Sequence, residues 1–340
     1  MPVRLPPRAE DPAKGPIATA LKENVSLSAS PFPLRIATRG SPLALAQAEE
    51  VAARLRTAHD LGPGDTEIIV LRTTGDRIQD RTLAEAGGKG LFTKEIEEAL
   101  IDGRADIAVH SAKDVPTWLP DGLVLAAFLE REDVRDAFVS PVADTLAGLP
   151  AGAVVGTASL RRQALVLRAR PDLKVVTLRG NVQTRLRKLA EGTVQATLLA
   201  LAGLKRLGAE AEATALFDTD TFPPALGQGA IAIETRADDD RINALVKALN
   251  HTETAAALTC ERAFLATLDG SCRTPIAGLA TVNGDDLTFR GLVISPDGRM
   301  AHEATAVGGR TEPEAIGRQT GEEIIARAGS DFLDALRTAH

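Results

Sequence analysis

The sequence predicts an α/β protein with two doubly wound lobes joined by a hinge, followed by a small C-terminal α+β domain. From residue 33 onward, short apolar strands alternate with helical patterns, which is typical of a sheet covered by helices. The alternation restarts after residue 140, which indicates a second lobe of similar build. Beyond about residue 250, the turn signals Asn283-Gly284 and Asp297-Gly298 separate three strand-like runs, so we expect a three-stranded antiparallel sheet with helices.

The first lobe carries clear helix and loop signals. Ser41 is a favoured N-cap residue and Pro42 a favoured first helical residue, so a helix should begin there. The stretch 76–90 is polar and holds three glycines, which predicts a mobile loop. The elements expected in this lobe are strands at 33–40, 66–75 and 105–116 and helices at 41–58 and 91–103.

In the second lobe, strand–helix pairs are expected at 153–170, 174–192 and 196–208. Residues 222–236 contain two prolines and two glycines, which suits a chain that returns through a hinge. A helix at 252–270 opens the C-terminal part and a helix at 312–338 closes it. We therefore divide the chain into domain 1 (32–130 and 228–248), domain 2 (131–227) and domain 3 (249–340).

Composition excludes several classes of protein. The 340 residues carry 39 basic and 46 acidic side chains, a net charge of −7, which argues against a nucleic-acid binder with a basic surface. No apolar stretch has the length of a membrane span. The two cysteines are too few for a disulfide framework, and the five histidines are scattered, so no metal site is predicted. The expected location is the cytoplasm, with no nucleic-acid or membrane partner.

Residues 1–31 differ from the rest of the chain. Prolines at positions 2, 6, 7, 12 and 16 interrupt any helix, and no apolar core of a signal peptide is present. Acidic residues such as Glu10 and Glu23 are also unusual in an organelle-targeting peptide. We predict a disordered extension.

Three segments share one design, in which a strand ends in a Gly, Ser or Asn turn and a helix begins beside arginine. They are Arg39-Gly40-Ser41, Thr157-Ala158-Ser159 with Arg161 and Arg162, and Arg179-Gly180-Asn181 with Arg185. A helix N-terminus attracts anions, so a cation there costs about 0.3–1 kcal/mol. Strand ends of this kind also face the ligand crevice of doubly wound sheets. We expect a cleft for several anions, although any single arginine could belong to a solvated helix face.

The type of anion follows from what the sequence lacks. It contains neither a phosphate-binding G-x-x-x-x-G-K-[ST] loop nor a G-x-G-x-x-G turn after a strand. Arginine forks match carboxylates as well as phosphates, so a polycarboxylate is favoured over a mononucleotide. We expect Arg161 and Arg162 to bind carboxylates of the ligand, because no other anion is evident near that helix start.

Two further residues are candidates for chemistry. Asp114 follows Lys113 at a strand end, where it forms either a local ion pair or a carboxylate that stabilises a developing cation. Cys272 lies in a Gly- and Pro-bounded loop beside Arg273, which favours a thiolate, whereas Cys260 lies among Ala and Leu in a helix and should be inert. On spacing alone, a lone cysteine in a loop is usually an ordinary thiol.

Nine motifs now show a resemblance to a known family. The chain resembles the porphobilinogen deaminase (hydroxymethylbilane synthase) family over residues 33–340. The motifs occur in the family's order, and small departures such as Ala112 leave every reactive position filled. They are ATRGSPLALAQA, GGKGLFTKEIE, ADIAVHSAKDVP, REDVRDAFVS, GTASLRRQ, LRGNVQTRLRKL, LAGLKRLG, LGQGAIAIE and GSCRTPIAG.

The resemblance implies a transferase of tetrapyrrole (haem- and chlorophyll-type) biosynthesis. Such an enzyme joins four porphobilinogen molecules head to tail into hydroxymethylbilane, releasing ammonia each time, on a covalent dipyrromethane primer. It also implies two periplasmic-binding-protein-like lobes and a lid near residues 75–90. We expect the protein to be a monomer. A non-catalytic two-lobed anion-binding or effector-sensing protein is the alternative, but it would not explain Asp114 or Cys272.

The resemblance also assigns roles to residues of this sequence. It implies that Cys272 holds the dipyrromethane cofactor by a thioether and that Asp114 is the catalytic aspartate, which would hold pyrrole N–H groups and stabilise azafulvene-like cations. Such preorganised charge is worth about 3–4 kcal/mol per group. The implied cofactor-binding residues are Ser111, Lys113, Thr157, Ser159, Arg161, Arg162 and Arg185. The implied substrate-binding residues are Arg39, Ser41, Gln47, Arg179 and Arg206.

Overall fold

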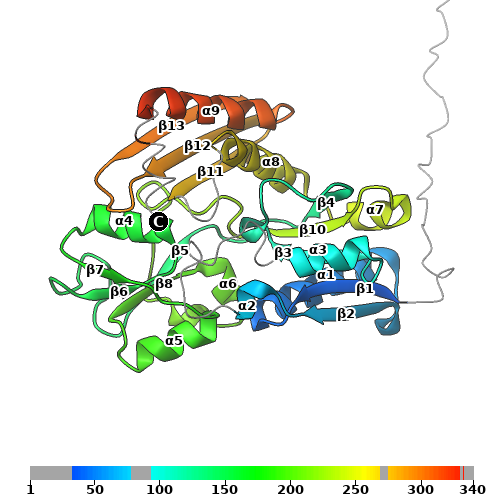
Figure 1. The fold of residues 1–340 in the computed structure, drawn as a ribbon, viewed down its shortest axis with the longest axis horizontal. Coiled ribbons are helices and arrows are strands. Elements are labelled where there is room, and N and C mark those ends of the chain that lie inside the picture. The colour runs from blue at the N-terminus through cyan, green and yellow to red at the C-terminus, as the bar shows by residue number, and fades with distance from the viewer. Residues whose placement is uncertain (1–32, 78–92, 269–274, 330–331, 333–340) are drawn as a thin grey trace, which may run out of the picture.

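The computed structural model describes residues 33–77, 93–268, 275–329 and 332. Three predictions fall on residues outside these ranges, namely the extension at 1–31, most of the loop at 75–90, and Cys272 with its neighbour Arg273. The described residues form three sheets, and Figure 1 shows two of them side by side with the third above. None of the described helices is both long enough and apolar enough to cross a lipid bilayer.

Lobe 1 is built on a five-stranded sheet in the order β2-β1-β3-β10-β4. β1 runs parallel to β2 and β3, whereas β10 runs antiparallel to both of its neighbours. The strands are β1 (Leu34–Arg39), β2 (Thr66–Leu71), β3 (Ile107–Ser111), β4 (Leu123–Phe128) and β10 (Ile231–Arg236). The helices are α1 (Pro42–His59), α2 (Thr74–Arg77), α3 (Lys94–Ile101) and α7 (Asp240–Lys247).

The start of α1 confirms the predicted cap. The Ser41 hydroxyl accepts a hydrogen bond from the Ala44 N–H at 3.2 Å, and Pro42 occupies the first turn. The apolar side of α1 then packs on β1, where Val51, Leu55 and Ile36 are fully buried. This packing holds the carboxyl end of β1 and the start of α1 at one edge of the sheet.

Lobe 2 repeats this arrangement in the order β7-β6-β8-β5-β9. β6 is parallel to β7 and β8, and β5 is antiparallel to β8 and β9, so the predicted similar build of the two lobes is confirmed. The strands are β5 (Asp136–Val139), β6 (Val154–Gly156), β7 (Lys174–Val176), β8 (Ala196–Ala200) and β9 (Ala215–Leu216). The helices are α4 (Leu160–Ala169), α5 (Val182–Ala190) and α6 (Leu201–Arg206).

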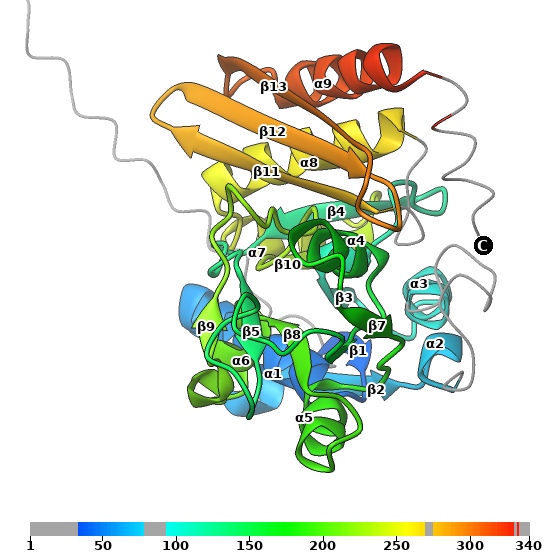
Figure 2. The ribbon, with the colours of Figure 1, turned by 90° about the vertical axis from the view of Figure 1, so that its left-hand side faces the viewer.

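The third sheet is antiparallel, with the predicted hairpins between its strands. It contains β11 (Ile276–Asn283), β12 (Asp286–Ile294) and β13 (Ala301–Gly309), and Figure 2 shows α8 (Thr252–Thr267) and α9 (Pro313–Ala328) on one of its faces. Phe264 of α8 meets Phe289 of β12 with 4.9 Å between ring centroids. Cys260 is fully buried in this core, and burial raises the pKa of its thiol, which agrees with the prediction of an inert cysteine.

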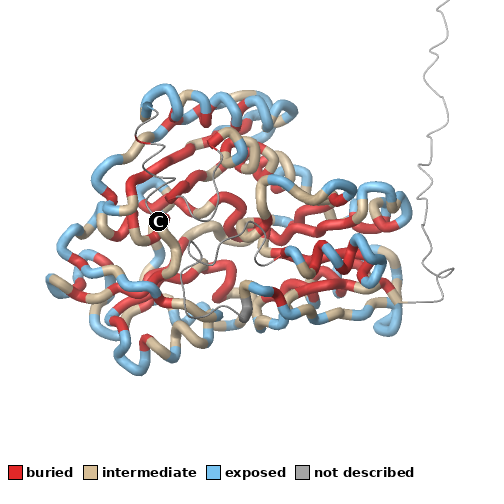
Figure 3. The backbone as a smooth tube through the Cα atoms, in the orientation of Figure 1, coloured by how far each residue is buried: buried red, intermediate tan, exposed pale blue. Residues whose placement is uncertain are grey.

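Buried segments run through each sheet in Figure 3, and the core of lobe 2 extends to the third sheet through Ala277, Leu292 and Ile294. The chain passes between the lobes twice, through residues 129–135 and again through residues 217–230. The predicted fold class, two doubly wound lobes and a C-terminal α+β part, is therefore confirmed.

Candidate polyanion-binding site between the lobes

A cavity of about 640 Å³ lies between the lobes, a size common for small-molecule sites. Lobe 1 contributes the ends of β1 and β3 and the start of α1, whereas lobe 2 contributes the start of α5 and the end of β8. Both lobes therefore present to the cavity the strand ends and helix starts that the sequence indicated.

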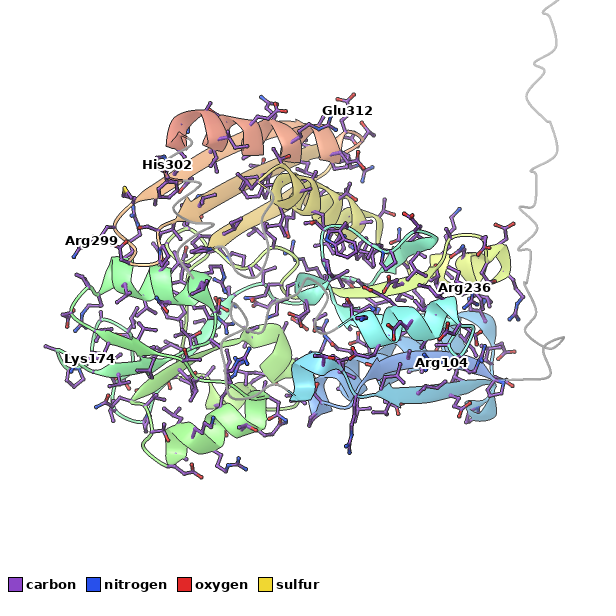
Figure 4. All side chains as sticks on the ribbon, in the orientation of Figure 1. Arg104, Lys174, Arg236, Arg299, His302 and Glu312 are labelled. Atoms are coloured by element: carbon purple, nitrogen blue, oxygen red, sulfur yellow. The ribbon has the colours of Figure 1, made fainter. Side chains whose placement is uncertain are left out.

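The described lining residues carry a large excess of positive charge. Six cationic side chains, Arg39, Arg72, Lys113, Arg162, Arg179 and Arg185, surround one carboxylate, Asp114. Charged residues elsewhere, such as Lys174 and Arg299, lie at the edge of the molecule in Figure 4. The cavity is thus suited to a ligand with several negative charges.

The helix starts at the cavity are capped by the predicted side chains. Ser159 accepts from the Arg162 N–H at 3.4 Å at the start of α4, and Asn181 accepts from the Thr184 N–H at 2.9 Å at the start of α5. The Thr157 hydroxyl in turn accepts from the Ser159 N–H at 3.1 Å. Thr157 and Ser159 therefore shape the turn before α4 through hydrogen bonds within the protein.

Asp136, at the start of β5, is the counter-ion of both arginines on α4. Its Oδ2 accepts from Arg161 Nη2 at 2.7 Å, and its Oδ1 accepts from Arg162 Nη2 at 2.6 Å. Burial alone would raise the pKa of Asp136, but the two guanidinium charges outweigh it and hold that pKa well below its usual range. The expectation that no protein anion serves Arg161 and Arg162 is therefore wrong.

The two arginines also differ in position. Arg161 is 4% exposed and donates through Nη1 to the Pro223 carbonyl at 2.8 Å, so its guanidinium is held inside lobe 2. Arg162 lines the cavity and donates a second bond to the Leu198 carbonyl at 2.9 Å. Of this pair, the structure brings Arg162 to the cavity and directs Arg161 toward Asp136 and Pro223.

Lys113 and Asp114 lie on a short 3₁₀ turn, Ala112–Asp114, directly after β3. Burial of the ammonium group, and after it the charge of Arg162, lowers the pKa of Lys113 to about 8. Burial lowers the pKa of Arg185 to about 10, again with a contribution from Arg162. Crowded cations of this kind favour an anion that would relieve their repulsion.

The Asp114 carboxylate, by contrast, is open to the cavity. Within the described part of the chain, no hydrogen bond joins it to another residue, although its charge acts on Lys113 and Arg185. It also lines a small adjoining cavity of about 60 Å³ with Gln47 and Ser111, whose side chains hydrogen-bond to each other at 3.0 Å. Asp114 is therefore placed to accept hydrogen bonds from a ligand.

Arg206 is not among the described residues that line the cavity. Its Nε lies 3.4 Å from Glu50 Oε2 on α1, and its Nη2 donates to the Gly229 carbonyl at 3.0 Å. The predicted substrate contact of Arg206 is thus replaced in this structure by contacts with lobe 1 and the hinge.

The described residues also include no group of three or more His, Cys, Asp or Glu side chains placed for a metal ion.

Sequence reasoning missed two residues of this site, Asp136 and Gln228. Gln228 is fully buried and donates to Asp136 Oδ1 at 2.9 Å, while accepting from Lys113 Nζ at 3.3 Å. A polar residue at the start of an otherwise apolar strand was the available signal for Asp136, and the Gly-Gln-Gly turn was the signal for Gln228.

Fold and cavity together define a protein that binds an anionic small molecule between two α/β lobes. Residues 34–244 match the family model described as porphobilinogen deaminase, dipyrromethane cofactor-binding domain, and residues 255–326 match the C-terminal domain of the same family. The chain belongs to the porphobilinogen deaminase family, an enzyme family of tetrapyrrole biosynthesis with a dipyrromethane cofactor.

Two individual relatives belong to the same family. The porphobilinogen deaminases of Nitrobacter hamburgensis and Nitrobacter winogradskyi are each 63% identical over 298 residues, which cover 88% of this chain and 94% of theirs.

Among solved structures, a putative methionine-binding lipoprotein of Bacillus subtilis has 14% identity to this chain and a TM-score of 0.41. The match covers 65% of this chain and 92% of the lipoprotein chain. A nutrient-binding protein of Burkholderia cenocepacia bound to methionine has 18% identity and a TM-score of 0.40, with 64% and 91% covered.

The donor set fits dipyrromethane. Two linked pyrroles with acetate and propionate side chains present four carboxylates and two N–H donors. The cavity offers several guanidinium and ammonium groups for the carboxylates and the open Asp114 carboxylate for the N–H groups.

Proposed function

We propose that this chain joins four porphobilinogen molecules head to tail into linear hydroxymethylbilane and releases one ammonia at each condensation. The observation that carries the proposal is the cavity lining, in which six cations surround the single described carboxylate, Asp114. Each porphobilinogen unit brings an acetate and a propionate, so the growing chain needs this excess of positive charge. The open carboxylate matches the pyrrole N–H groups and the positive charge that forms when ammonia leaves.

We assign cofactor attachment to Cys272, through a thioether. Bound dipyrromethane supplies the pyrrole carbon to which the first substrate molecule is joined. Lys113, Arg162 and Arg185 would hold its carboxylates. These contacts between cations and carboxylates would be supported by Ser111, Thr157 and Ser159. Thr157 and Ser159 would do so by shaping the turn before α4.

We assign the substrate and the growing chain to the remaining cations of the cavity. Arg39 and Arg179 face it from opposite lobes, and Ser41 lies at the N-terminus of α1, where substrate carboxylates gain from the helix dipole. Gln47 would orient Ser111 through their hydrogen bonds. A substrate contact of Arg206 requires that it first leave Glu50.

Asp114 would act at two points of each condensation. Its carboxylate accepts hydrogen bonds from pyrrole N–H groups and so orients the ring. The same charge stabilises the methylene carbon of the substrate as the carbon–nitrogen bond breaks and positive charge develops there. Lys113 and Arg185 lie near enough for their charges to act with that of Asp114.

Intact-protein mass spectrometry tests the proposal directly. The purified protein should carry the mass of two pyrrole units, and added porphobilinogen should give further increments and a tetrapyrrole product. Cys272→Ser should lack the dipyrromethane mass, whereas Cys260→Ser, a change in the core of the C-terminal domain, should keep it. If Cys260→Ser lacks the dipyrromethane mass and Cys272→Ser keeps it, the cofactor is not attached to Cys272.

The alternative, a non-catalytic anion-binding protein, predicts no mass increment and no consumption of porphobilinogen. Family membership favours the enzyme. A cytoplasmic location and a monomeric state remain predictions from the sequence.

A further inference from the structure

The segment Gly227-Gln228-Gly229 is built to hold one side chain in place where the chain returns from lobe 2 to lobe 1. Both glycines have positive φ, +74° and +89°. A Cβ on Gly227 would lie 2.9 Å from the backbone nitrogen of Lys113, and one on Gly229 would overlap the Glu132 carbonyl oxygen. The backbone on either side of Gln228 therefore packs directly against the Lys113 turn and against the other crossing between the lobes.

The buried amide of Gln228 joins groups of both lobes. Its Oε1 accepts from Lys113 Nζ at 3.3 Å, and its Nε2 donates to Asp136 Oδ1 at 2.9 Å and to the Val134 carbonyl at 2.8 Å. Reversing the amide would set its oxygen against two acceptors and its NH₂ against an ammonium group, so these partners fix its orientation.

The bonds continue from Asp136 to Arg162, whose Nη2 donates to the same Oδ1 at 2.6 Å. Lys113 lines the cavity from lobe 1 and Arg162 lines it from lobe 2. A continuous series of hydrogen bonds, Lys113 to Gln228 to Asp136 to Arg162, thus links the two cations across the hinge.

We infer that Gln228 is a positioning residue that fixes the placement of Lys113 relative to Arg162, so that the two lobes present their carboxylate-binding cations in one arrangement. This inference rests on the proposed function for the identity of the ligand, but the linkage itself is a property of the cofactor-free chain. The physical reason is that an ammonium group on a four-carbon stem loses conformational entropy on binding, and a fixed acceptor removes much of that cost beforehand.

Two variants of Gln228 separate positioning from packing. Gln228→Leu keeps similar volume but makes none of the three hydrogen bonds, so it should raise the KM for porphobilinogen about tenfold, the scale of one lost hydrogen bond to a charged group, with a smaller change in kcat. Gln163→Leu is the matched control, because the Gln163 amide donates to the Pro296 carbonyl at 3.4 Å and is not among the described residues that line the cavity. It should leave KM and kcat as in the parent.

Gln228→Glu adds a test by pH. When protonated, the new carboxyl can accept from Lys113 and donate to Asp136, as the amide does. When ionised, it faces Asp136 with a second negative charge. Its KM should therefore approach the parent value at low pH and rise with increasing pH, with an inflection at lower pH than the one that Lys113 gives in the parent and in Gln163→Leu. A role in packing alone predicts a loss that does not depend on pH.

A third measurement does not depend on activity. NMR titration of protein labelled with ¹³C at lysine Cε, with Lys113→Arg to assign the signal, should show a lower pKa for Lys113 in Gln228→Leu than in Gln163→Leu, because the ammonium loses an acceptor. A pH dependence of KM in Gln228→Glu that equals the parent's would overturn the inference even if Gln228→Leu does not fold. An unchanged Lys113 titration in folded Gln228→Leu would do the same. A parent that consumes no porphobilinogen would instead overturn the proposed function and leave the titration to decide the role of Gln228.

Discussion

Asp114 and Asp136 are two carboxylates set among arginines, and they differ in which groups satisfy them. Asp136 is fully buried and receives hydrogen bonds from Arg161, Arg162 and Gln228. Asp114 faces the cavity, and within the described residues no hydrogen bond reaches its carboxylate. The difference shows how one arrangement of charges can serve both stability and chemistry: the saturated carboxylate fixes the cations, and the open one remains available to a ligand.

The largest effect should come from Asp136, on stability. Asp136→Asn keeps the shape but leaves two buried guanidinium groups without their counter-ion, which should lower the free energy of unfolding by about 3–5 kcal/mol. Urea denaturation followed by circular dichroism measures this loss. Asp172→Asn is the control, because Asp172 pairs with Arg170 at the surface and should change the unfolding midpoint little. Equal midpoints for both variants would show that Asp136 is not the structural carboxylate.

For Asp114 the expected effect is on turnover. Asp114→Asn keeps the shape and loses the charge, so turnover of the cofactor-loaded enzyme should fall by about 10²–10³. Asp114→Glu keeps the charge but displaces it by one methylene, and should also slow turnover while the cofactor stays attached. Steady-state rates with porphobilinogen, alongside urea midpoints near the parent value, check both variants. A rate within a few-fold of the parent for Asp114→Asn would remove this residue from the chemistry.

The two arginines of α4 should differ in their effects on cofactor occupancy and on stability. Arg162→Leu removes a cation from the cavity and should give protein with little dipyrromethane by intact mass. Arg161→Leu removes a guanidinium that is directed toward Asp136 and Pro223, so we expect it to lower stability and to retain more cofactor than Arg162→Leu. Occupancy measured after incubation with porphobilinogen, together with melting temperature, distinguishes them. The reverse order of occupancy would place Arg161, not Arg162, at the ligand.

The smallest effect concerns the protonation of Lys113. Its pKa near 8 is depressed by burial and by Arg162, and a bound carboxylate would raise it, so binding takes up a proton above pH 8. The KM for porphobilinogen should then rise with pH above 8, by at most about tenfold per pH unit. Lys113→Arg retains its charge throughout this range and should flatten the profile. An identical rise in both proteins would assign the dependence to another group.

Local signals in the sequence determined the elements and several details of the site. The N-caps Ser41, Ser159 and Asn181 were predictable because a cap depends on residues within one turn of the helix. The hairpins of the third sheet followed from Asn283-Gly284 and Asp297-Gly298 for the same reason. The positions of Lys113 and Asp114 at a strand end, and hence at the cavity, followed from the alternation of strands and helices.

Only the tertiary structure decided which charges meet. Asp136 lies 25 residues from Arg161 and 92 from Gln228, and Arg206 lies 156 residues from Glu50. Neither helical nor strand periodicity carries information about such pairs, because each partner is set by a different element and the distance between them by how the lobes pack. The sequence by itself therefore determined where cations gather at the strand ends. Folding decided that Asp136 pairs with Arg161 and Arg162 within lobe 2 and that Asp114 stays open to the cavity.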